Sequence, residues 1–179
     1  MSRIRIEAIG ITEAGTECVV NAANSRLAGG SGVCGAIFDA AGWDEMQAAC
    51  DAIGHCDTGS AVMTPAFRMD ARFVIHAVGP VWQGGRNGEP EKLYGCYRAS
   101  LDLAARHGCR SIAFPLISSG IYGYPKEEAW KVALRACTDY LNENPDCEME
   151  IVFAAFKEGL AQMGRKELEC LTERTGSWS

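Results

Sequence analysis

Two glycine-rich segments of this chain combine residue types that bind anions. One is residues 20–37 (VNAANSRLAGGSGVCGAI), and the other is residues 114–125 (FPLISSGIYGYP). In each, an apolar run typical of a buried strand leads into glycines and small residues, and a helical pattern follows. Such a loop presents backbone N–H groups and the positive end of a helix dipole to a negatively charged ligand. Two loops of this kind could hold two phosphate groups.

The residues expected to face the phosphates act through their main chain, and glycine allows the backbone to approach a ligand closely. Asn24 can both donate and accept, which suits ribose hydroxyls or a positioned water; its structural alternative is a turn-forming Asn that bonds its own backbone. The expected amide donors are Gly32, Val33, Cys34 and Gly35 in the first loop, and Ser118, Ser119, Gly120, Ile121 and Tyr122 in the second.

Composition narrows the class of protein. The 179 residues are 47% hydrophobic, which predicts one globular domain. A net charge of −6 argues against sequence-independent binding to nucleic acid or to an anionic membrane, so a bound phosphate would be held mainly by backbone amides. No run of about 18 apolar residues and no signal-peptide core is present, and we therefore expect a soluble, cytoplasmic protein without a membrane partner.

The nine cysteines are scattered and include no C-x-x-C pair. Most are expected to be small buried hydrophobic residues. The best metal candidate is His55-Cys56 with Cys50, but a zinc site needs three or four converging ligands. We therefore predict no metal and no cofactor.

Apolar periodicity predicts strands alternating with helices. Strands are expected at residues 3–9, 18–23, 60–64, 73–78, 111–117 and 149–155, and helices at 33–53 (broken at Gly42-Trp43), 92–107, 126–142 and 160–171. This order predicts an α/β fold, a three-layer α/β/α sandwich around a mixed, largely parallel sheet. It forms a single domain over residues 1–171, with a flexible tail at 172–179. Both glycine loops follow strands, so they can share one cleft at the carboxyl edge of the sheet.

Residues 30–35 match the dinucleotide-binding pattern G-x-G-x-x-G, but the residues around them do not meet the requirements of that motif. That motif must directly follow the first strand and be followed about twenty residues later by an acid at the tip of the next strand. Here a loop of about six residues precedes Gly30, and the next strand ends at Thr64-Pro65 without a carboxylate. No G-x-x-x-x-G-K-[ST] sequence is present either, which excludes a P-loop NTPase.

Five ordered motifs support one family. They are VNAAN at 20–24, AI at 36–37 with AAG at 40–42, CDTG at 56–59, IHAVGPVW at 75–82 and SGIYGYP at 119–125. Together they resemble the macrodomain family, in particular its bacterial ADP-ribosyl hydrolases and O-acetyl-ADP-ribose deacetylases. The resemblance covers nearly the whole chain. It implies an ADP-ribose cleft, with the pyrophosphate between the two glycine loops and the distal ribose against the first.

The resemblance also implies roles for individual residues. Phe156 stands where the family stacks adenine, with core packing as an equally good alternative, and Ile11 lies in the segment at the adenine end. Asn24 and Cys34 take the catalytic positions. His76 lies in an apolar strand and is expected to be a core residue. Tyr122 and Tyr124 belong to the second loop and are expected to cover the ligand, with loop packing as the alternative.

Three departures from the family pattern bear on function. Gly10 replaces the acid that usually accepts the adenine amino group, and losing such a hydrogen bond costs about 1.5–3 kcal/mol, or about 10- to 150-fold in affinity. Cys34 replaces the Asp that usually activates or orients water. Phe38 stands where His is frequent.

Three hypotheses remain open. The leading one is an enzyme that hydrolyses an ester at the distal ribose of an acyl-ADP-ribose or of an ADP-ribosylated acidic side chain, with Asn24 and the bound phosphate orienting water. The alternative is a non-catalytic reader of ADP-ribose or a related nucleotide. In the third, Cys34 at the helix start is a nucleophile.

Overall fold

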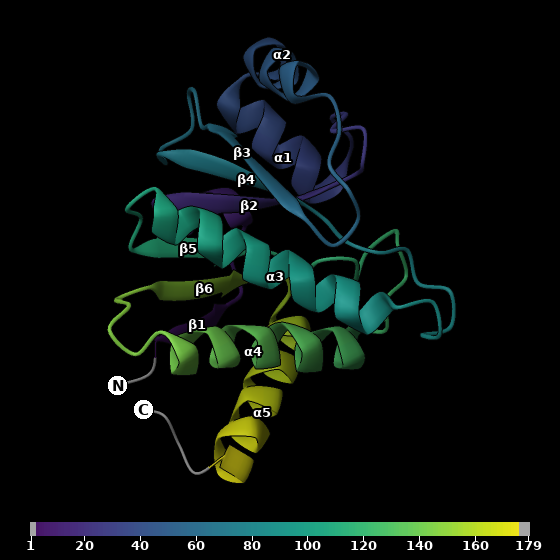
Figure 1. The fold of residues 1–179 in the computed structure, drawn as a ribbon, viewed down its shortest axis with the longest axis vertical. Helices are drawn as coiled ribbons and strands as arrows, with labels where there is room; N and C mark the ends of the chain where they lie inside the picture. Colours follow the sequence, from purple (N-terminus) through teal and green to yellow (C-terminus); the bar gives the residue numbers. More distant parts are fainter. Residues whose placement is uncertain (1–2, 176–179) are drawn as a thin grey trace.

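A computed structural model describes residues 3–175. Six strands form one sheet in the order β1-β6-β5-β2-β4-β3 (Figure 1). All neighbours pair in parallel except β3 and β4, which are antiparallel. The sheet is therefore mixed and largely parallel, as predicted. The strands are β1 (Ile4–Glu7), β2 (Cys18–Ala23), β3 (Ala61–Pro65), β4 (Phe73–Val78), β5 (Ser111–Phe114) and β6 (Glu150–Ala154).

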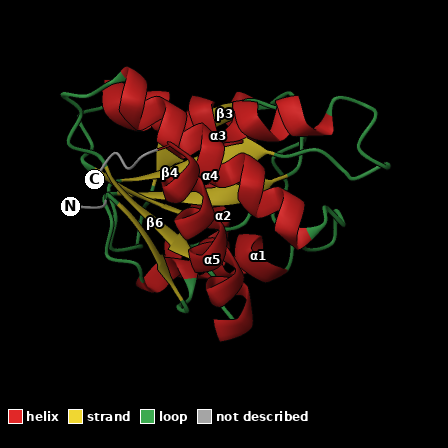
Figure 2. Ribbon diagram, turned by 90° about the horizontal axis from the view of Figure 1, so that it is seen from below, coloured by secondary structure: helices red, strands yellow, loops and turns green. Residues whose placement is uncertain are grey.

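Helices cover both faces of this sheet, as Figure 2 shows, which gives the three-layer sandwich predicted from the sequence. On one face lie α3 (Glu89–Arg106), α4 (Lys126–Glu143) and α5 (Glu158–Thr175). On the other lie α1 (Gly32–Ala41), α2 (Trp43–Ile53) and a single 3-10 turn, η1 (Ile11–Glu13). None of the helices in residues 3–175 has the length and apolar character needed to cross a membrane.

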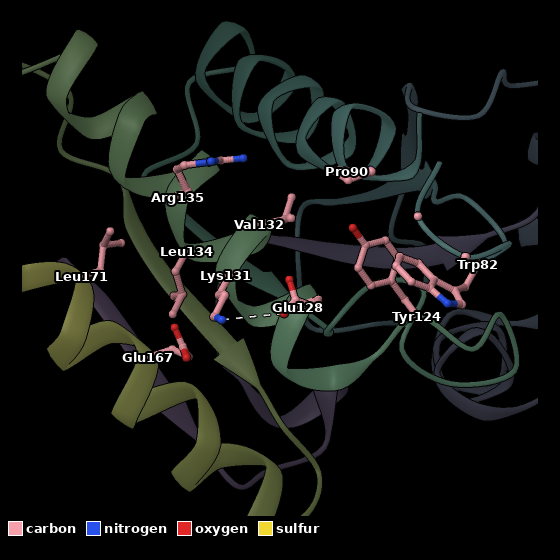
Figure 3. A pocket seen from close by; sticks show the side chains of 12 residues that line it. Trp82, Pro90, Tyr124, Glu128, Lys131, Val132, Leu134, Arg135, Glu167 and Leu171 are labelled. Atoms are coloured by element: carbon pink, nitrogen blue, oxygen red, sulfur yellow. Dashed lines mark ion pairs between the residues drawn. The ribbon is translucent and has the colours of Figure 1, made fainter. Parts of the chain in front are cut away.

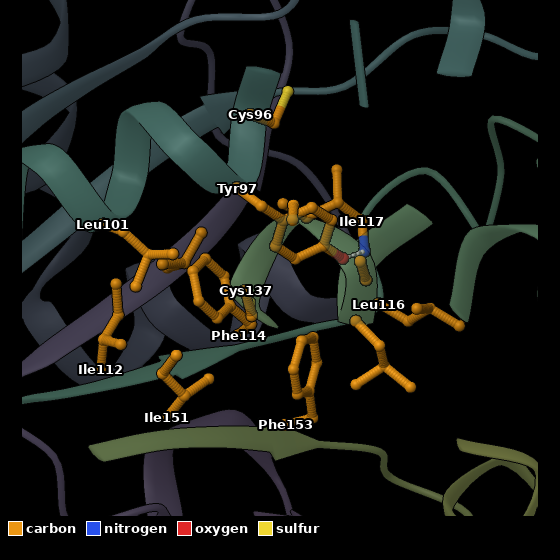
Figure 4. Close-up of a cluster of buried hydrophobic side chains, with 14 of the residues drawn as sticks. Cys96, Tyr97, Leu101, Ile112, Phe114, Leu116, Ile117, Cys137, Ile151 and Phe153 are labelled. Carbon is orange, nitrogen blue, oxygen red and sulfur yellow. Dashed lines mark hydrogen bonds between the residues drawn. The ribbon is translucent and has the colours of Figure 1, made fainter. Parts of the chain in front are cut away.

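Successive side chains of each strand point to opposite faces of the sheet and so contribute to two hydrophobic clusters. In β2, Val20 points into the cluster beneath α3 and α4, whereas Val19 points into the one beneath α1 and α2. The larger cluster is rich in aromatic rings (Figure 4). There the ring centroid of Phe114 lies 4.9 Å from that of Tyr97 and 5.6 Å from that of Phe153. The layers are thus held mainly by burial of aliphatic and aromatic side chains.

Several element boundaries differ from those expected. β5 ends at Phe114 rather than at residue 117, because Pro115 has no N–H to donate and the Ile117 N–H bonds to the Tyr97 hydroxyl. α3 begins at Glu89, three residues before the expected start. α5 continues to Thr175, so the tail predicted from residue 172 is helical at its start, and residues 176–179 lie outside the described part.

The topology brings four chain segments to one edge of the sheet. β2 and β5 are neighbours, so the first loop, after β2, and the second, after β5, begin side by side. β6 and β1 follow in the same sheet and end at the same edge, where Phe156 and η1 lie. The predicted binding residues therefore share the carboxyl edge of the parallel strands, where ligands of such sheets bind.

Candidate ligand-binding site

The Asn24 side chain hydrogen-bonds to the backbone at the start of the first loop. Its side-chain Nδ2 donates to the Ala28 carbonyl at 3.0 Å, and its Oδ1 accepts from the Ala28 N–H at 3.1 Å. The turn-forming role that we weighed against a ligand role is thus present. Because an amide oxygen accepts two hydrogen bonds and an NH₂ donates two, each group keeps one position for a ligand or a water. Asn24 is half-buried, so its ligand role stays a prediction.

The first loop ends in the helix start that was expected to bind a phosphate. α1 begins at Gly32, whose φ is +62°, and its N-cap residue, Ser31, makes no side-chain cap. A Cβ on Gly35 would lie 2.8 Å from the Gly30 carbonyl oxygen, so glycine is needed there. Gly32 is exposed and Val33 half-buried. The N–H groups of Gly32, Val33 and Cys34 precede the first intrahelical bond, so this end can receive an anion. The Gly35 N–H instead donates to the Ser31 carbonyl at 3.3 Å, which contradicts the prediction that it binds a phosphate.

Cys34 lies in the first turn of α1 with 9% of its surface exposed. A nucleophilic thiol is usually activated by a neighbouring histidine or another base. The three histidines of the chain bind elsewhere: His55 to Asp57, His76 to Asn21 and Thr64, and His107 to the Leu103 carbonyl. This arrangement favours the structural role of Cys34 over the nucleophile hypothesis.

The second loop turns sharply at Ser118, whose φ of +69° is unusual for a residue with a side chain. Backbone bonds close it: the Tyr124 N–H donates to the Ser118 carbonyl at 2.9 Å and the Gly123 N–H to the Gly120 carbonyl at 3.0 Å. Ser118 is 6% exposed, and its buried hydroxyl has no hydrogen-bond partner within residues 3–175. Ile121 projects into solvent with 92% of its surface exposed.

The two tyrosines of this loop differ in surroundings. Tyr122 is half-buried, which is compatible with covering a ligand. Tyr124 is 2% exposed, and its ring centroid lies 4.7 Å from that of Trp82. Burial raises the pKa of Tyr124 to about 12. The prediction that Tyr124 covers the ligand is therefore wrong; it packs beneath the loop.

Phe156 is 76% exposed just after β6, so the core-packing alternative is excluded and a surface for stacking remains. The Ala155 N–H donates to the Glu7 carbonyl at 2.9 Å, so the segment before Phe156 lies beside the end of β1. Gly10 and η1 follow β1 along the chain. The Ile11 side chain is 5% exposed within the core. A ligand contact by Ile11 would therefore have to come from its backbone.

Comparison with known proteins agrees with this geometry. The family model described as "Macro domain" matches residues 20–133, a span of more than half of the chain that contains both glycine loops. The chain belongs to the macro domain family.

Three relatives extend over nearly all of this macrodomain. A Salmonella typhimurium protein named O-acetyl-ADP-ribose deacetylase is 44% identical over 166 residues, which cover 90% of this chain and 92% of that protein. The Oceanobacillus iheyensis macrodomain with ADP superposes with a TM-score of 0.88 at 37% identity, covering 94% of this chain and 91% of the other. For the Trypanosoma brucei macrodomain in complex with ADP-ribose, the TM-score is 0.85 at 36% identity, covering 94% and 69%.

His76 of this macrodomain is a core residue, as predicted. It is 1% exposed, and its Nδ1 lies 3.1 Å from Asn21 Nδ2 while its Nε2 lies 3.0 Å from Thr64 Oγ1. Burial lowers its pKa to about 4, so the ring is neutral at physiological pH. Phe38, which replaces the frequent His of the family, is also buried and packs edge-on against the His76 ring.

The three residues of the metal candidate, Cys50, His55 and Cys56, contact different groups. Cys50 lies 3.8 Å from His76 Nε2, whereas His55 binds Asp57 and Cys56 Sγ bonds to the Asp57 carbonyl. Within residues 3–175, the macrodomain has no group of three or more His, Cys, Asp or Glu side chains suited to a metal ion.

Supporting residues of the second loop were missed as site residues. Tyr97, from α3, accepts the Ile117 N–H at 3.0 Å and donates to the Pro115 carbonyl at 3.3 Å. Trp82 donates its backbone N–H to the Tyr122 carbonyl at 2.9 Å. The IHAVGPVW motif contained Trp82, but nothing in its spacing indicated which loop it would contact.

A groove of about 510 Å³ opens beside the second loop and follows α4 towards α5 (Figure 3). Trp82 and Tyr124 line one end of it, and Leu171 and Glu167 line the other. It meets the second loop only at Tyr124 and does not reach the first loop. The groove is therefore separate from the ligand site expected between the two glycine loops.

Proposed function

We propose that this macrodomain binds ADP-ribose at the carboxyl edge of its sheet and hydrolyses an ester at the distal ribose. The substrate is an O-acyl-ADP-ribose or a protein mono-ADP-ribosylated on an acidic side chain. One observation carries the proposal: both glycine loops and the exposed Phe156 meet at this single edge. The 44% identity to an O-acetyl-ADP-ribose deacetylase supports it.

In this proposal the ligand is bound mainly by uncharged groups. The helix start at Gly32 and the amides of the second loop receive the pyrophosphate. Phe156 stacks on the adenine. Because the chain carries a net charge of −6, this recognition depends on oriented N–H groups rather than on an excess of Lys and Arg.

The adenine end contains a substitute for the acid absent at Gly10. Glu13 Oε1 accepts the Gly10 N–H at 3.1 Å, and a Cβ built on Gly10 would lie only 2.7 Å from that oxygen. The Glu13 carboxylate thus occupies the space into which a side chain at position 10 would extend. We propose that its second oxygen accepts the adenine amino group, which would offset the loss of the usual acid.

The reaction consists of attack by one water on the ester carbonyl. Asn24, which keeps one free donor and one free acceptor position, orients this water together with the bound phosphate. Loop amides stabilise the negative charge that develops on the carbonyl oxygen. The bond between the acyl carbon and the ribose oxygen then breaks, the ribose oxygen takes a proton, and a carboxylic acid and ADP-ribose are released.

The alternative is a non-catalytic reader of ADP-ribose. The observation that favours it is the buried Cys34 thiol, which stands where a carboxylate would act on water, while the three histidines bond to other residues. A reader would bind ADP-ribose and leave acyl-ADP-ribose intact.

Turnover of O-acetyl-ADP-ribose, followed by chromatography, decides between these functions. The hydrolase predicts turnover by the wild type, a loss of about tenfold or more in kcat/KM for Asn24→Ala, and no comparable loss for Asn142→Ala, an exposed control on α4. Cys34→Ala should retain activity, because the thiol is not the nucleophile. Tight binding without turnover in the wild type, with turnover appearing in Cys34→Asp, would establish the reader instead.

A further inference from the structure

Glu89 is a buried carboxylate without a cationic partner. It is the first residue of α3, its side chain is 1% exposed, and it forms no ion pair within residues 3–175. Burying an ionised carboxylate is costly unless other groups compensate its charge. Its surroundings must therefore supply strong hydrogen bonds.

Three backbone N–H groups converge on this carboxylate. Gln83 and Gly85 donate to Oε2 at 2.8 and 3.0 Å, and Asn87 donates to Oε1 at 2.6 Å. Burial raises the pKa of the Glu89 carboxyl, but the hydrogen bonds from these N–H groups lower it by more. The result is a pKa of about 2. The charged side chain is thus the centre around which residues 83–87 wrap.

The backbone of this loop is shaped for that role. Gly84, Gly85 and Gly88 have φ of +91°, +85° and +76°, a region that residues with a side chain rarely adopt. The Asn87 side chain closes the loop by donating to Gln83 Oε1 at 2.8 Å. Without the carboxylate, three N–H groups would lose their acceptor, and little else would keep the loop in this conformation.

Trp82 connects this loop to the second glycine loop. The Trp82 backbone N–H donates to the Tyr122 carbonyl at 2.9 Å. The Trp82 ring packs on Tyr124, as Figure 3 shows. The Trp82 ring also lies against Gly85, where an added Cβ would approach Trp82 Cη2 to 2.7 Å. A displacement of Gly85 would therefore displace Trp82, and with it a bond that holds Tyr122.

We propose that Glu89 is a positioning residue that fixes the second glycine loop through residues 83–87 and Trp82. It orients the amides of residues 120–122 toward the ligand without touching the ligand itself, whereas the Ser119 N–H donates within the loop to the Leu116 carbonyl at 3.3 Å. Its effect on affinity rests on the proposed function, whereas its effect on the loop does not. The competing explanation is that Glu89 only caps α3, since an acid in the first turn interacts favourably with the helix dipole.

Glu89→Gln tests the proposal, with Glu91→Gln as the matched control. Both residues lie in the first turn of α3, so both substitutions remove a negative charge from the helix start, but Glu91 is exposed and forms no hydrogen bond or ion pair with residues 83–88. We expect Glu89→Gln to raise amide hydrogen exchange in residues 83–88 and also in residues 118–124 of the ligand-free protein. Calorimetry should show at least about tenfold weaker ADP-ribose binding for Glu89→Gln and no change for Glu91→Gln.

Faster exchange confined to residues 83–88, with unchanged ADP-ribose affinity, would overturn the proposal. If Glu89→Gln does not fold, Gly85→Ala serves as the second variant, since it displaces Trp82 and leaves the carboxylate in place. It should raise exchange in residues 118–124, and an unchanged second loop would again overturn the proposal. If the wild type bound no ADP-ribose, the proposed function would fail, while the exchange result would still decide the role of Glu89.

Discussion

Gly79 and Ser118 approach so closely that a side chain on Gly79 would overlap the Ser118 hydroxyl. A Cβ on Gly79 would lie 2.2 Å from Ser118 Oγ and 2.5 Å from Ile117 Cγ2. Gly79 follows β4, whereas Ser118 follows β5, and β2 lies between these two strands. The second glycine loop thus reaches across the end of β2, where the first loop begins. This crossing is what brings the two anion-binding segments together.

Gly79→Ala should displace the second loop. Overpacking of this kind costs about 1–3 kcal/mol in the free energy of unfolding, and the shifted amides should weaken ADP-ribose binding by about tenfold or more. Urea unfolding and calorimetry measure the two effects. The control is Gly159→Ala in α5, where an added Cβ meets nothing within 4 Å. Wild-type affinity in Gly79→Ala would show that the close contact does not set the loop.

Phe156→Ala should weaken nucleotide binding with little effect on stability. The ring is 76% exposed, so it contributes little to the core, whereas stacking of a base on an aromatic side chain is worth about 1–3 kcal/mol. Calorimetry should show about 5- to 150-fold weaker ADP-ribose binding. Phe67, 41% exposed after β3 at the opposite edge of the sheet, supplies the control Phe67→Ala. Equal affinities of the two variants would remove Phe156 from the site.

Glu13 should confer a preference for a base that carries an amino group. The wild type is expected to bind ADP-ribose about tenfold or more tightly than its inosine analogue, in which a carbonyl replaces the amino group. Glu13→Gln should reduce that preference, because its amide is a weaker acceptor. If the wild type binds both ligands equally tightly, the carboxylate near Gly10 does not contact the base.

Stability should fall as the pH drops from 6.5 towards 4. Burial lowers the pKa of folded His76 to about 4, below the value of about 6.5 in the unfolded chain, so the unfolded state binds the proton first. The contribution of His76 to the free energy of unfolding is retained above pH 6.5 and decreases by about 1.4 kcal/mol per pH unit below it, up to about 3 kcal/mol. Urea unfolding at several pH values measures this slope. The slope should persist in His55→Gln, an exposed control, and should be smaller in His76→Gln. If His76→Gln keeps the wild-type slope, other groups cause the loss of stability at low pH.

Sequence alone predicted the elements whose signals are local. β2 has the expected bounds because polar residues flank its apolar run, and β4 because its run lies between Arg72 and Gly79-Pro80. The helical region breaks at Gly42, whose φ is +106°. β5 was predicted too long because residues 115–117 continue its apolar run. Their backbone is bonded instead to Tyr97, a partner from another element that no local pattern indicates.

The same distinction holds for the site. The two glycine loops and the position of Asn24 were predicted, since spacing and residue type show them directly. Whether Phe156 packs in the core or faces solvent depends on the whole fold, and the sequence left both open. Glu89 was not predicted as part of the site because its partners are backbone groups; an acid ending a glycine-rich loop was the available signal.

A calorimetric titration of the wild-type protein with ADP-ribose, with AMP as the comparison ligand, tests the central claim most directly. Two anion-binding loops beside an exposed aromatic ring predict binding of ADP-ribose in the micromolar range and at least about tenfold weaker binding of AMP, which lacks the second phosphate and the distal ribose. Absence of ADP-ribose binding, or equal affinity for AMP, would contradict the account, because the two loops would then not act together on one ligand.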